Sequence, residues 1–303
     1  MTNPVNRRNF MSLSAKAAAI AVVSASLEGR LQAEDDVAAS VGGNVNHSVC
    51  KWCYSGISIE AICEAGKEFG LQSVELLQPE EIATVQKFDM TCAMVSNPTV
   101  KAADGKNVGG ITLAWNRPQY HDALLAAYEV QIKKSIAAGV KNVICFSGNR
   151  DGMDDQQGMK NCAEGLKKLM PIAEKAGVTI TMELLNSKVN HADYMCDHTQ
   201  WGVGLCEEIG SDNFKLLYDI YHMQIMEGDV ISTIRKHNQY ISHYHTGGVP
   251  GRNEIDETQE LYYPSIMKAI VETGYKGFVG QEFIPKRSDK LASLKQGVTI
   301  CNV

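Results

Sequence analysis

The 303-residue sequence lacks any concentration of basic residues: Lys and Arg number 29 against 35 Asp and Glu, the formal net charge is −6, and the cations are scattered. Because proteins that bind nucleic acid neutralise phosphates with clustered Lys and Arg, this distribution argues against a nucleic-acid partner. A small-molecule substrate fits the charge better. With 44% hydrophobic and 21% charged residues, the chain has the composition of a folded globular protein with a sizeable core.

The sequence also lacks an apolar run long enough to span a membrane permanently. Its apolar N-terminal stretch, residues 13–27, is short and interrupted by polar residues. The twin arginines Arg7 and Arg8 precede this stretch, and a small-residue cleavage site after Ala33 follows it. This order is typical of a signal peptide, and the arginine pair favours twin-arginine export to the periplasm. We therefore expect a signal peptide over residues 1–33 and a mature domain over residues 34–303; if the stretch is instead an amphipathic helix, the protein is cytoplasmic.

The nine cysteines lack the pattern of a disulfide framework. They are odd in number and spread through predicted strands and helices, so we expect mostly free thiols. Cys50 and Cys53 form a CxxC pair, but no second pair completes it. A lone pair of this kind is weak evidence for zinc or redox chemistry, and we interpret it as structural.

No G-x-G-x-x-G or P-loop motif follows an early predicted strand, which argues against a doubly wound, nucleotide-binding sheet. No linker, low-complexity run or second domain interrupts the chain either. Instead, eight short apolar runs alternate with helical patterns. The predicted strands are residues 47–53, 73–77, 90–96, 142–148, 178–185, 214–220, 240–246 and 277–283.

Apolar residues three and four positions apart predict helices between these strands, the clearest over residues 58–70, 123–139 and 165–177. Each pattern closes near a Gly, as helices often do. Polar residues 148–158 predict a long loop after the fourth strand. The alternation predicts an α/β fold with a parallel sheet, and eight units in roughly 270 residues match a single (β/α)8 TIM barrel, which typically needs ~250. A doubly wound open sheet is the alternative.

Four predicted strands end in ionisable side chains. Glu183 ends the fifth strand, Asp219 the sixth, His245 the seventh and Glu282 the eighth. Because reactive groups of a TIM barrel collect at the carboxyl ends of its strands, these four should lie side by side at the barrel mouth. Three carboxylates and one imidazole suit one divalent cation, Mn²⁺, Mg²⁺, Co²⁺ or Zn²⁺. A dication would also relieve the repulsion among partly buried carboxylates.

Each of these residues has a purely structural alternative. Asp219 could cap a helix, Glu282 could be half of an ion pair, and His245 could be a core histidine with satisfied hydrogen bonds. Their joint position at the ends of consecutive strands favours the metal site, because unrelated structural roles do not explain the shared placement.

Longer motifs surround these residues: EL-x-NS at residues 183–187, YDIYHMQ-x-MEGD at 218–229, PGRNEID at 250–256 and GYKGFVGQEF at 274–283. They resemble hydroxypyruvate isomerase and, more widely, the xylose isomerase-like barrel family, which includes ketose 3-epimerases. The resemblance covers nearly the whole predicted mature chain and is strongest in its C-terminal part, where these motifs lie.

The resemblance implies roles for the four strand-end residues. In this family the glutamates that match Glu183 and Glu282 bind the metal and act as the acid/base pair, and the positions that match Asp219 and His245 complete the metal shell. Hydroxypyruvate isomerases carry an amide where this chain has His245, whereas the epimerases carry a histidine. The difference is compatible with a metal site and weakens the case for hydroxypyruvate as the substrate.

The same resemblance implies that His222 and Arg252 contact substrate oxygens. A His and an Arg are suitable donors to an enediolate or a carboxylate. Their structural alternatives are a capping His and a surface Arg. Asn186 is a further substrate-binding candidate, while Arg150 and His121 are weaker ones; all three fall on predicted loops near the barrel mouth.

Together these features predict a metal-dependent isomerase or epimerase of a sugar or hydroxy-keto acid, hydroxypyruvate isomerase-like, that moves a proton through an enediolate. Return of the proton to the adjacent carbon gives isomerisation, and delivery to the opposite face by the second glutamate gives epimerisation. The alternatives are a metal-dependent dehydratase or lyase acting on a polyol or keto-inositol, an apurinic endonuclease-like nuclease, and a non-catalytic sugar-binding protein. The sequence leaves the oligomeric state open, a homo-oligomer included.

Overall fold

The computed structural model describes residues 43–303. The predicted signal peptide, residues 1–33, lies outside the described residues. Within the described range, no helix is both long enough and apolar enough to cross a bilayer.

Seven parallel strands form one sheet in the order β2-β1-β9-β8-β7-β6-β5. They confirm seven of the eight predicted strands, with ends that differ by at most three residues. Strands that are adjacent in most of the sheet also follow one another in the chain, as repeated βα units require. The strands are β1 (Asn46–Cys50), β2 (Leu71–Glu75), β5 (Asn142–Cys145), β6 (Thr179–Glu183), β7 (Phe214–Asp219), β8 (Ile241–Thr246) and β9 (Phe278–Gln281).

Residues 90–96, predicted as the third strand, do not form a regular strand, so this prediction is wrong in detail. The segment nevertheless fills the gap between β2 and β5. Thr91 makes an isolated parallel bridge to Ser73 of β2, and Val95 makes one to Val143 of β5. The seven strands and this eighth extended segment therefore close into a barrel, which confirms the predicted fold.

The irregular pairing of residues 90–96 with β2 has a local cause. β2 ends at Glu75, and the next residue, Leu76, has a φ of 56°, which breaks the extended backbone that a continuous ladder needs. The Ser73 hydroxyl accepts the Ala93 N–H at 2.8 Å, so a side chain replaces one backbone partner. The apolar pattern identifies residues 90–96 as part of the barrel, but these local contacts determine that the segment pairs irregularly with β2 and β5.

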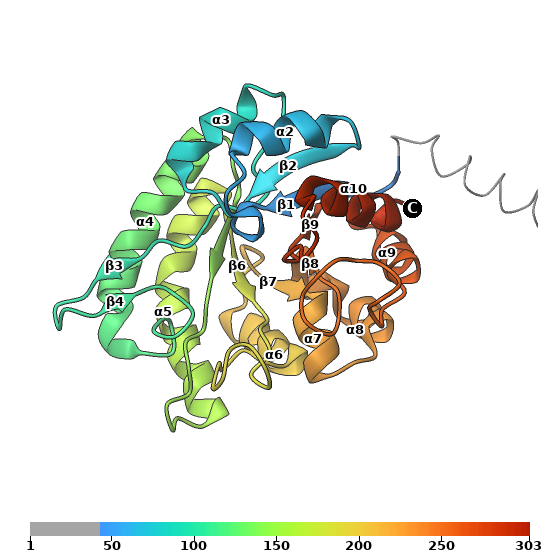
Figure 1. Ribbon diagram of the computed structural model, residues 1–303. Helices are drawn as coiled ribbons and strands as arrows, with labels where there is room; N and C mark the ends of the chain where they lie inside the picture. The colour runs from blue at the N-terminus through green and yellow to red at the C-terminus, as the bar shows by residue number, and fades with distance from the viewer. Residues whose placement is uncertain (1–42) are drawn as a thin grey trace, which may run out of the picture. The chain divides into compact units, whose positions relative to one another are not determined.

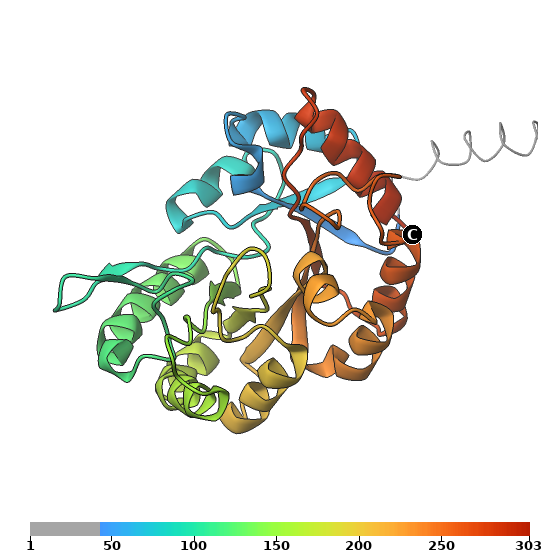
Figure 2. The same cartoon turned by 60° about the horizontal axis from the view of Figure 1, so that its bottom comes forward.

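The helices surround the strands (Figures 1 and 2). Helices cover the outside of the barrel and side chains fill its inside. Because both faces of each strand are therefore buried, the strand sequences are nearly continuous apolar runs. The helices are α2 (Ile59–Lys67), α3 (Ile82–Gln86), α4 (His121–Ala137), α5 (Asp155–Ala176), α6 (Thr199–Ile209), α7 (Ile220–Met226), α8 (Val230–His237), α9 (Tyr263–Glu272) and α10 (Lys290–Cys301), with short 3₁₀ helices η1 (Lys51–Tyr54), η2 (Pro79–Glu81), η3 (Pro118–Tyr120) and η4 (Asn238–Tyr240).

The predicted long loop over residues 148–158 is only partly correct. Helix α5 begins at Asp155, because Asp154 caps it: the Asp154 carboxylate accepts the Gln157 N–H at 2.9 Å. The helix then continues to Ala176, so it starts ten residues before the predicted segment. A small antiparallel hairpin, β3 (Val100–Lys101) with β4 (Asn107–Val108), was not predicted.

All nine cysteines are buried and free, which confirms the prediction of free thiols. Cys50 ends β1, and Cys53 lies in η1 directly after it. Burial raises the pKa of both thiols well above the usual value, with Cys50 and Cys53 close to the charged groups described below. Buried thiols with raised pKa values are poor nucleophiles, which favours the structural interpretation of the CxxC pair over redox chemistry.

Candidate active site

The four ionisable residues at the strand ends lie together, as the sequence predicts. Glu183 and Asp219 end β6 and β7, His245 lies in β8, and Glu282 directly follows β9. Asp219 is paired in register with His245 across neighbouring strands. One potential ligand atom from each of the four lies within 4.8 Å of the others, and all four side chains are buried. Their geometry is that of a group that could hold a metal ion.

His245 turns one ring nitrogen toward the carboxylates. Its Nδ1 lies 2.9 Å from Glu282 Oε2 and 3.4 Å from Glu183 Oε1. Neither contact has hydrogen-bond geometry, and both His245 Nδ1 and Glu183 Oε1 are buried without a hydrogen-bond partner among residues 43–303. Unsatisfied buried polar atoms are costly, and a cation between them would satisfy both. The donor set of three carboxylates and one imidazole therefore fits a divalent cation.

Glu75 holds the other side of the His245 ring. His245 Nε2 lies 2.7 Å from Glu75 Oε1, and the same oxygen lies 2.7 Å from His243 Nε2. Burial by itself would raise the pKa of Glu75, but the two histidines bring it well below the usual range, so the carboxylate is ionised. Burial opposes a charge on His245, but the neighbouring Cys50 and Glu282 raise the pKa of His245 well above its usual value, so the ring is protonated without a cation. Because Glu75 accepts the Nε2–H, Nδ1 is the nitrogen that would lose its proton and bind the cation.

Sequence reasoning missed Glu75. The available signal was an acidic residue inside the apolar run 73–77, where a strand buried on both faces usually carries Val, Ile or Leu. Gly280 of β9 leaves room for the contact: a methyl group at this position would lie 2.8 Å from the His245 ring and 2.9 Å from Glu75 Oε1.

The three carboxylates of the cluster differ in their affinity for protons. Burial, and then the neighbouring Glu282 charge, raise the pKa of Glu183, and burial raises the pKa of Asp219 well above its usual value. Burial also disfavours the charged form of Glu282, but Arg252 and His245 hold the pKa of Glu282 well below the usual range.

Arg252 supplies the positive charge next to Glu282. Its Nη2 contacts the Glu282 carboxylate and lies 3.1 Å from Asp219 Oδ2, and its Nε donates to the Glu282 backbone carbonyl at 3.2 Å. The guanidinium also lies over the rings of Trp52 and Tyr221, 5.2 Å and 5.4 Å from their centroids. Trp52, which sequence reasoning also missed, donates its Nε1–H to Glu282 Oε1 at 2.8 Å. Arg252 and Trp52 thus each hold one oxygen of the Glu282 carboxylate.

His222 lies beside Asp219 and is fully buried. The Asn186 backbone N–H donates to His222 Nδ1 at 3.1 Å, so the ring proton resides on Nε2. This Nε2 lies 3.6 Å from Asp219 Oδ2 and has no hydrogen-bond partner among the described residues. Burial, and then the charge of Arg252, lower the pKa of His222 well below its usual value, so the ring is neutral. His222 thus presents an unpaired N–H donor at the edge of the carboxylate cluster.

The other three predicted residues are engaged elsewhere. The Asn186 side-chain amide lies 2.6 Å from His222 Nδ1, so it orients that ring, and substrate binding by Asn186 stays a prediction. Arg150 forms an ion pair with Asp197 at 2.9 Å. His121 Nε2 lies 2.9 Å from a backbone carbonyl and is buried. Neither Arg150 nor His121 lines the pocket beside the carboxylates.

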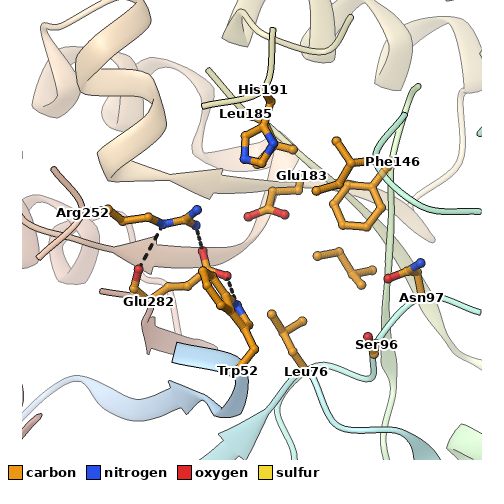
Figure 3. Close-up of a pocket in the computed structure, with 12 residues that line it drawn as sticks. Trp52, Leu76, Ser96, Asn97, Phe146, Glu183, Leu185, His191, Arg252 and Glu282 are labelled. Carbon is orange, nitrogen blue, oxygen red and sulfur yellow. Dashed lines mark hydrogen bonds and ion pairs between the residues drawn. The ribbon is translucent and has the colours of Figure 1, made fainter. Parts of the chain in front are cut away.

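A pocket of about 430 Å³ opens beside the cluster, a size within the range of small-molecule sites. Figure 3 shows Glu183 and Glu282 extending into this space, with Arg252 and Trp52 next to Glu282. His191 also lines the pocket. Both glutamates of the predicted acid/base pair therefore reach the space that a small molecule can occupy.

A family model described as "Xylose isomerase-like TIM barrel" matches residues 63–299 of the sequence, which is more than half of the chain. The chain belongs to the xylose isomerase-like TIM barrel family. The match includes all four strand-end residues and every motif that carries the resemblance seen in the sequence.

Curated relatives match this family member over part of their length. A 2-oxo-tetronate isomerase of Cupriavidus necator is 35% identical over 114 residues, 38% of this chain and 43% of that protein. Hydroxypyruvate isomerase of Escherichia coli is 30% identical over 172 residues, 55% of this chain and 63% of that protein. The matched region thus spans less than two thirds of the length of these relatives.

Solved structures share the fold over most of the chain. An AP endonuclease, family 2, from Brucella melitensis superposes with a TM-score of 0.70 at 24% identity, covering 82% of this chain and 97% of that one. D-psicose 3-epimerase from Clostridium cellulolyticum H10 superposes with a TM-score of 0.64 at 18% identity, covering 84% and 97%. At these identities the likeness establishes the shared barrel.

In this member of the xylose isomerase-like TIM barrel family, replacing Glu75 by Gln should weaken divalent-cation binding by roughly 10- to 100-fold. The neutral amide no longer holds the Nε2–H of His245 as an anion does, so the Nδ1 lone pair is oriented less firmly. Calorimetric titration of the cation-free protein with Mn²⁺ or Zn²⁺ measures the change.

His243→Asn is the matched control for Glu75→Gln. It removes the other histidine that contacts Glu75 and leaves the 2.7 Å contact between Glu75 and His245 in place. We expect this variant to bind the cation within about threefold of the unmodified protein. Equal cation affinity in Glu75→Gln and the unmodified protein would show that Glu75 does not orient His245.

Proposed function

We propose that this protein is a divalent-metal-dependent isomerase or epimerase of a sugar or hydroxy-keto compound. Glu183 and Glu282 are its acid/base pair, and Glu183, Asp219, His245 and Glu282 hold the cation. The observation that carries the proposal is the position of these four side chains: their ligand atoms lie within 4.8 Å of one another, and both glutamates line one small-molecule pocket. The names of the curated relatives, a 2-oxo-tetronate isomerase and a hydroxypyruvate isomerase, support the reaction class.

The chemical problem is the removal of a weakly acidic C–H proton next to a carbonyl. A divalent cation held by the four ligands would polarise the carbonyl as a Lewis acid. Glu183 is the better-placed proton acceptor because its Oε1 has no hydrogen-bond partner among residues 43–303, whereas the Glu282 carboxylate is contacted by Arg252 and Trp52. Proton removal by Glu183 leaves the substrate as an enediolate.

The neighbouring donors stabilise the charge that develops on the substrate oxygens. Arg252 lines the pocket beside Glu282 and offers its guanidinium N–H groups, and fully buried His222 holds a neutral Nε2–H, unpaired among the described residues, beside Asp219. Return of the proton from Glu183 to the adjacent carbon, with a hydroxyl proton passing from one substrate oxygen to the other, gives isomerisation. If Glu282 is protonated while Glu183 is ionised, Glu282 delivers its proton to the opposite face of the same carbon and Glu183 keeps the proton it removed, which gives epimerisation; the same pair serves both reactions.

Deuterium exchange tests the proposed function. Purified protein reconstituted with Mn²⁺, Mg²⁺, Co²⁺ or Zn²⁺ is incubated in deuterated water with hydroxypyruvate, ketoses and keto-inositols, and the products are identified by NMR. We expect deuterium at the carbon next to the carbonyl, together with an isomeric product. Tight binding without exchange would favour a sugar-binding protein, loss of water would favour a dehydratase, and sustained nicking of abasic DNA would favour a nuclease.

A further inference from the structure

The pocket is divided into a charged part and an apolar part. The charged part consists of Glu183, Glu282 and Arg252 near the carboxylate cluster. In Figure 3, Phe146 lies across the pocket from Arg252. The apolar part comes from β5 and from the segments that follow β2, β4, β5 and β6, and we call it the apolar wall: Leu76, Ile111, Ile144, Phe146 and Leu185.

Among the described residues, every Lys or Arg that lines this pocket already has carboxylate partners, so no positive charge is left over for an anionic group of a substrate. Arg252 is the one Lys or Arg that lines the pocket within residues 43–303, and it is paired with the carboxylates of both Glu282 and Asp219. His191, the lining histidine, adds no charge, because burial, and then Arg252, lower its pKa. The remaining polar lining groups, Ser96 and Asn97, are neutral partners suited to hydroxyl groups.

The site has no surplus positive charge for a charged substrate. The carboxylates of Glu75, Glu183, Asp219 and Glu282 carry −4, Arg252 carries +1, and a dication would add +2, so the sum is −1. A carboxylate or phosphate on the substrate would introduce an uncompensated negative charge beside buried carboxylates, where repulsion is poorly screened.

We propose that the substrate is an uncharged polyhydroxy carbonyl compound, a ketose or keto-sugar, rather than a 2-keto acid or a phosphate ester. Its carbonyl end lies at the carboxylate cluster and its remote end packs on the apolar wall, where the C–H faces of a sugar gain from burial. The position of the substrate carbonyl at the carboxylate cluster rests on the proposed function. The inference that the substrate is uncharged rests on the residues of the pocket alone.

A matched pair of four-carbon compounds tests this substrate class. Erythrulose is an uncharged ketose, and 2-oxo-tetronate differs from it by a carboxylate in place of the hydroxymethyl group next to the carbonyl. Dissociation constants from equilibrium dialysis with cation-loaded protein measure binding, and deuterium exchange measures turnover. We expect erythrulose to bind at least about tenfold more tightly than the acid, because only the acid brings an unbalanced charge.

Variants of Ile111 test the cause of this preference. Ile111 is half-buried on the pocket wall, so a long polar side chain fits there without unfolding the core. Ile111→Arg adds a cation to the apolar wall, toward which the acid can turn its carboxylate in a reversed orientation, so the ratio of the two dissociation constants should shift toward the acid by at least about tenfold. Ile111→Gln, the matched uncharged control, should leave the ratio within about threefold.

Binding and turnover separate the two proposals. Preferential binding of erythrulose without exchange would contradict the proposed function and support the substrate class. Binding of 2-oxo-tetronate as tightly as erythrulose, failure of both to bind, or an unchanged ratio in Ile111→Arg would overturn the substrate class, even if exchange confirms the isomerase chemistry.

Discussion

Replacing either Glu183 or Glu282 by Gln should reduce the rate of proton exchange by about 1,000-fold. Gln has nearly the size of Glu but accepts no proton and carries no charge for the cation. Both side chains line the pocket, and their ligand atoms belong to one cluster, so the loss affects acid/base chemistry and cation binding together. Deuterium exchange at saturating cation measures the change.

The two substitutions should have different effects on stability. This difference shows whether the slower exchange comes from lost chemistry or from a folding defect common to both variants. Folding raises the pKa of Glu183, so its charge is destabilising near neutral pH and Glu183→Gln should keep or increase the melting temperature of cation-free protein. Folding lowers the pKa of Glu282, so its charge is stabilising above its unfolded pKa. Removing it leaves Arg252 short of one partner and should cost about 3 kcal/mol.

Glu164→Gln is the matched control for both variants. Glu164 is exposed on α5, where it contacts Lys168 at 3.4 Å, and it lies outside the pocket. Its replacement should leave exchange unchanged and stability within about 0.5 kcal/mol. Exchange at the unmodified rate in Glu183→Gln and in Glu282→Gln would refute the assignment of these residues as the acid/base pair.

Removal of divalent cations by a chelator should reduce exchange by at least about 100-fold, because Lewis-acid stabilisation contributes several kcal/mol to such reactions. Adding Mn²⁺, Mg²⁺, Co²⁺ or Zn²⁺ back should restore it and identify the preferred ion. The cation should also stabilise the fold by about 2.7 kcal/mol at a concentration 100 times its dissociation constant. Thermal unfolding with and without added cation measures this second effect independently of turnover.

The cation-dependent shift in melting temperature should be much smaller in Asp219→Asn, which removes one carboxylate charge from the four-residue cluster. Burial raises the pKa of Asp219 well above its usual value, so the neutral amide itself is tolerated in cation-free protein. An unchanged cation response in Asp219→Asn would place the binding site elsewhere. Full exchange after exhaustive chelation would refute the metal-dependent mechanism.

Much of the fold follows from short-range patterns in the sequence. Apolar runs such as residues 214–219 alternate with helical patterns, and parallel βα units have few ways to arrange eight such repeats. The same logic locates the site: since all parallel strands point the same way, Glu183, Asp219 and Glu282 reach the same end of the barrel. This part needs no knowledge of individual side-chain contacts.

Local hydrogen bonds set the details that apolar patterning leaves out. The early start of α5 depends on the Asp154 cap, and the irregular pairing of residues 90–96 depends on the conformation of Leu76 and on a Ser73 side-chain contact. A capping aspartate and a serine occur equally often in loops, so their residue types alone do not predict these roles.

By itself, the sequence determined the barrel, the free thiols and the four residues of the carboxylate cluster, because each depends on periodicity, composition or position at a strand end. Only the tertiary structure decided how that cluster is supported. Glu75 and His245 are separated by 170 positions and meet because the barrel closes, and Trp52 reaches Glu282 across 230 positions in the same way. The tertiary structure also decided that the charge of Arg252 is neutralised by Asp219 and Glu282, because these side chains meet only in the folded pocket.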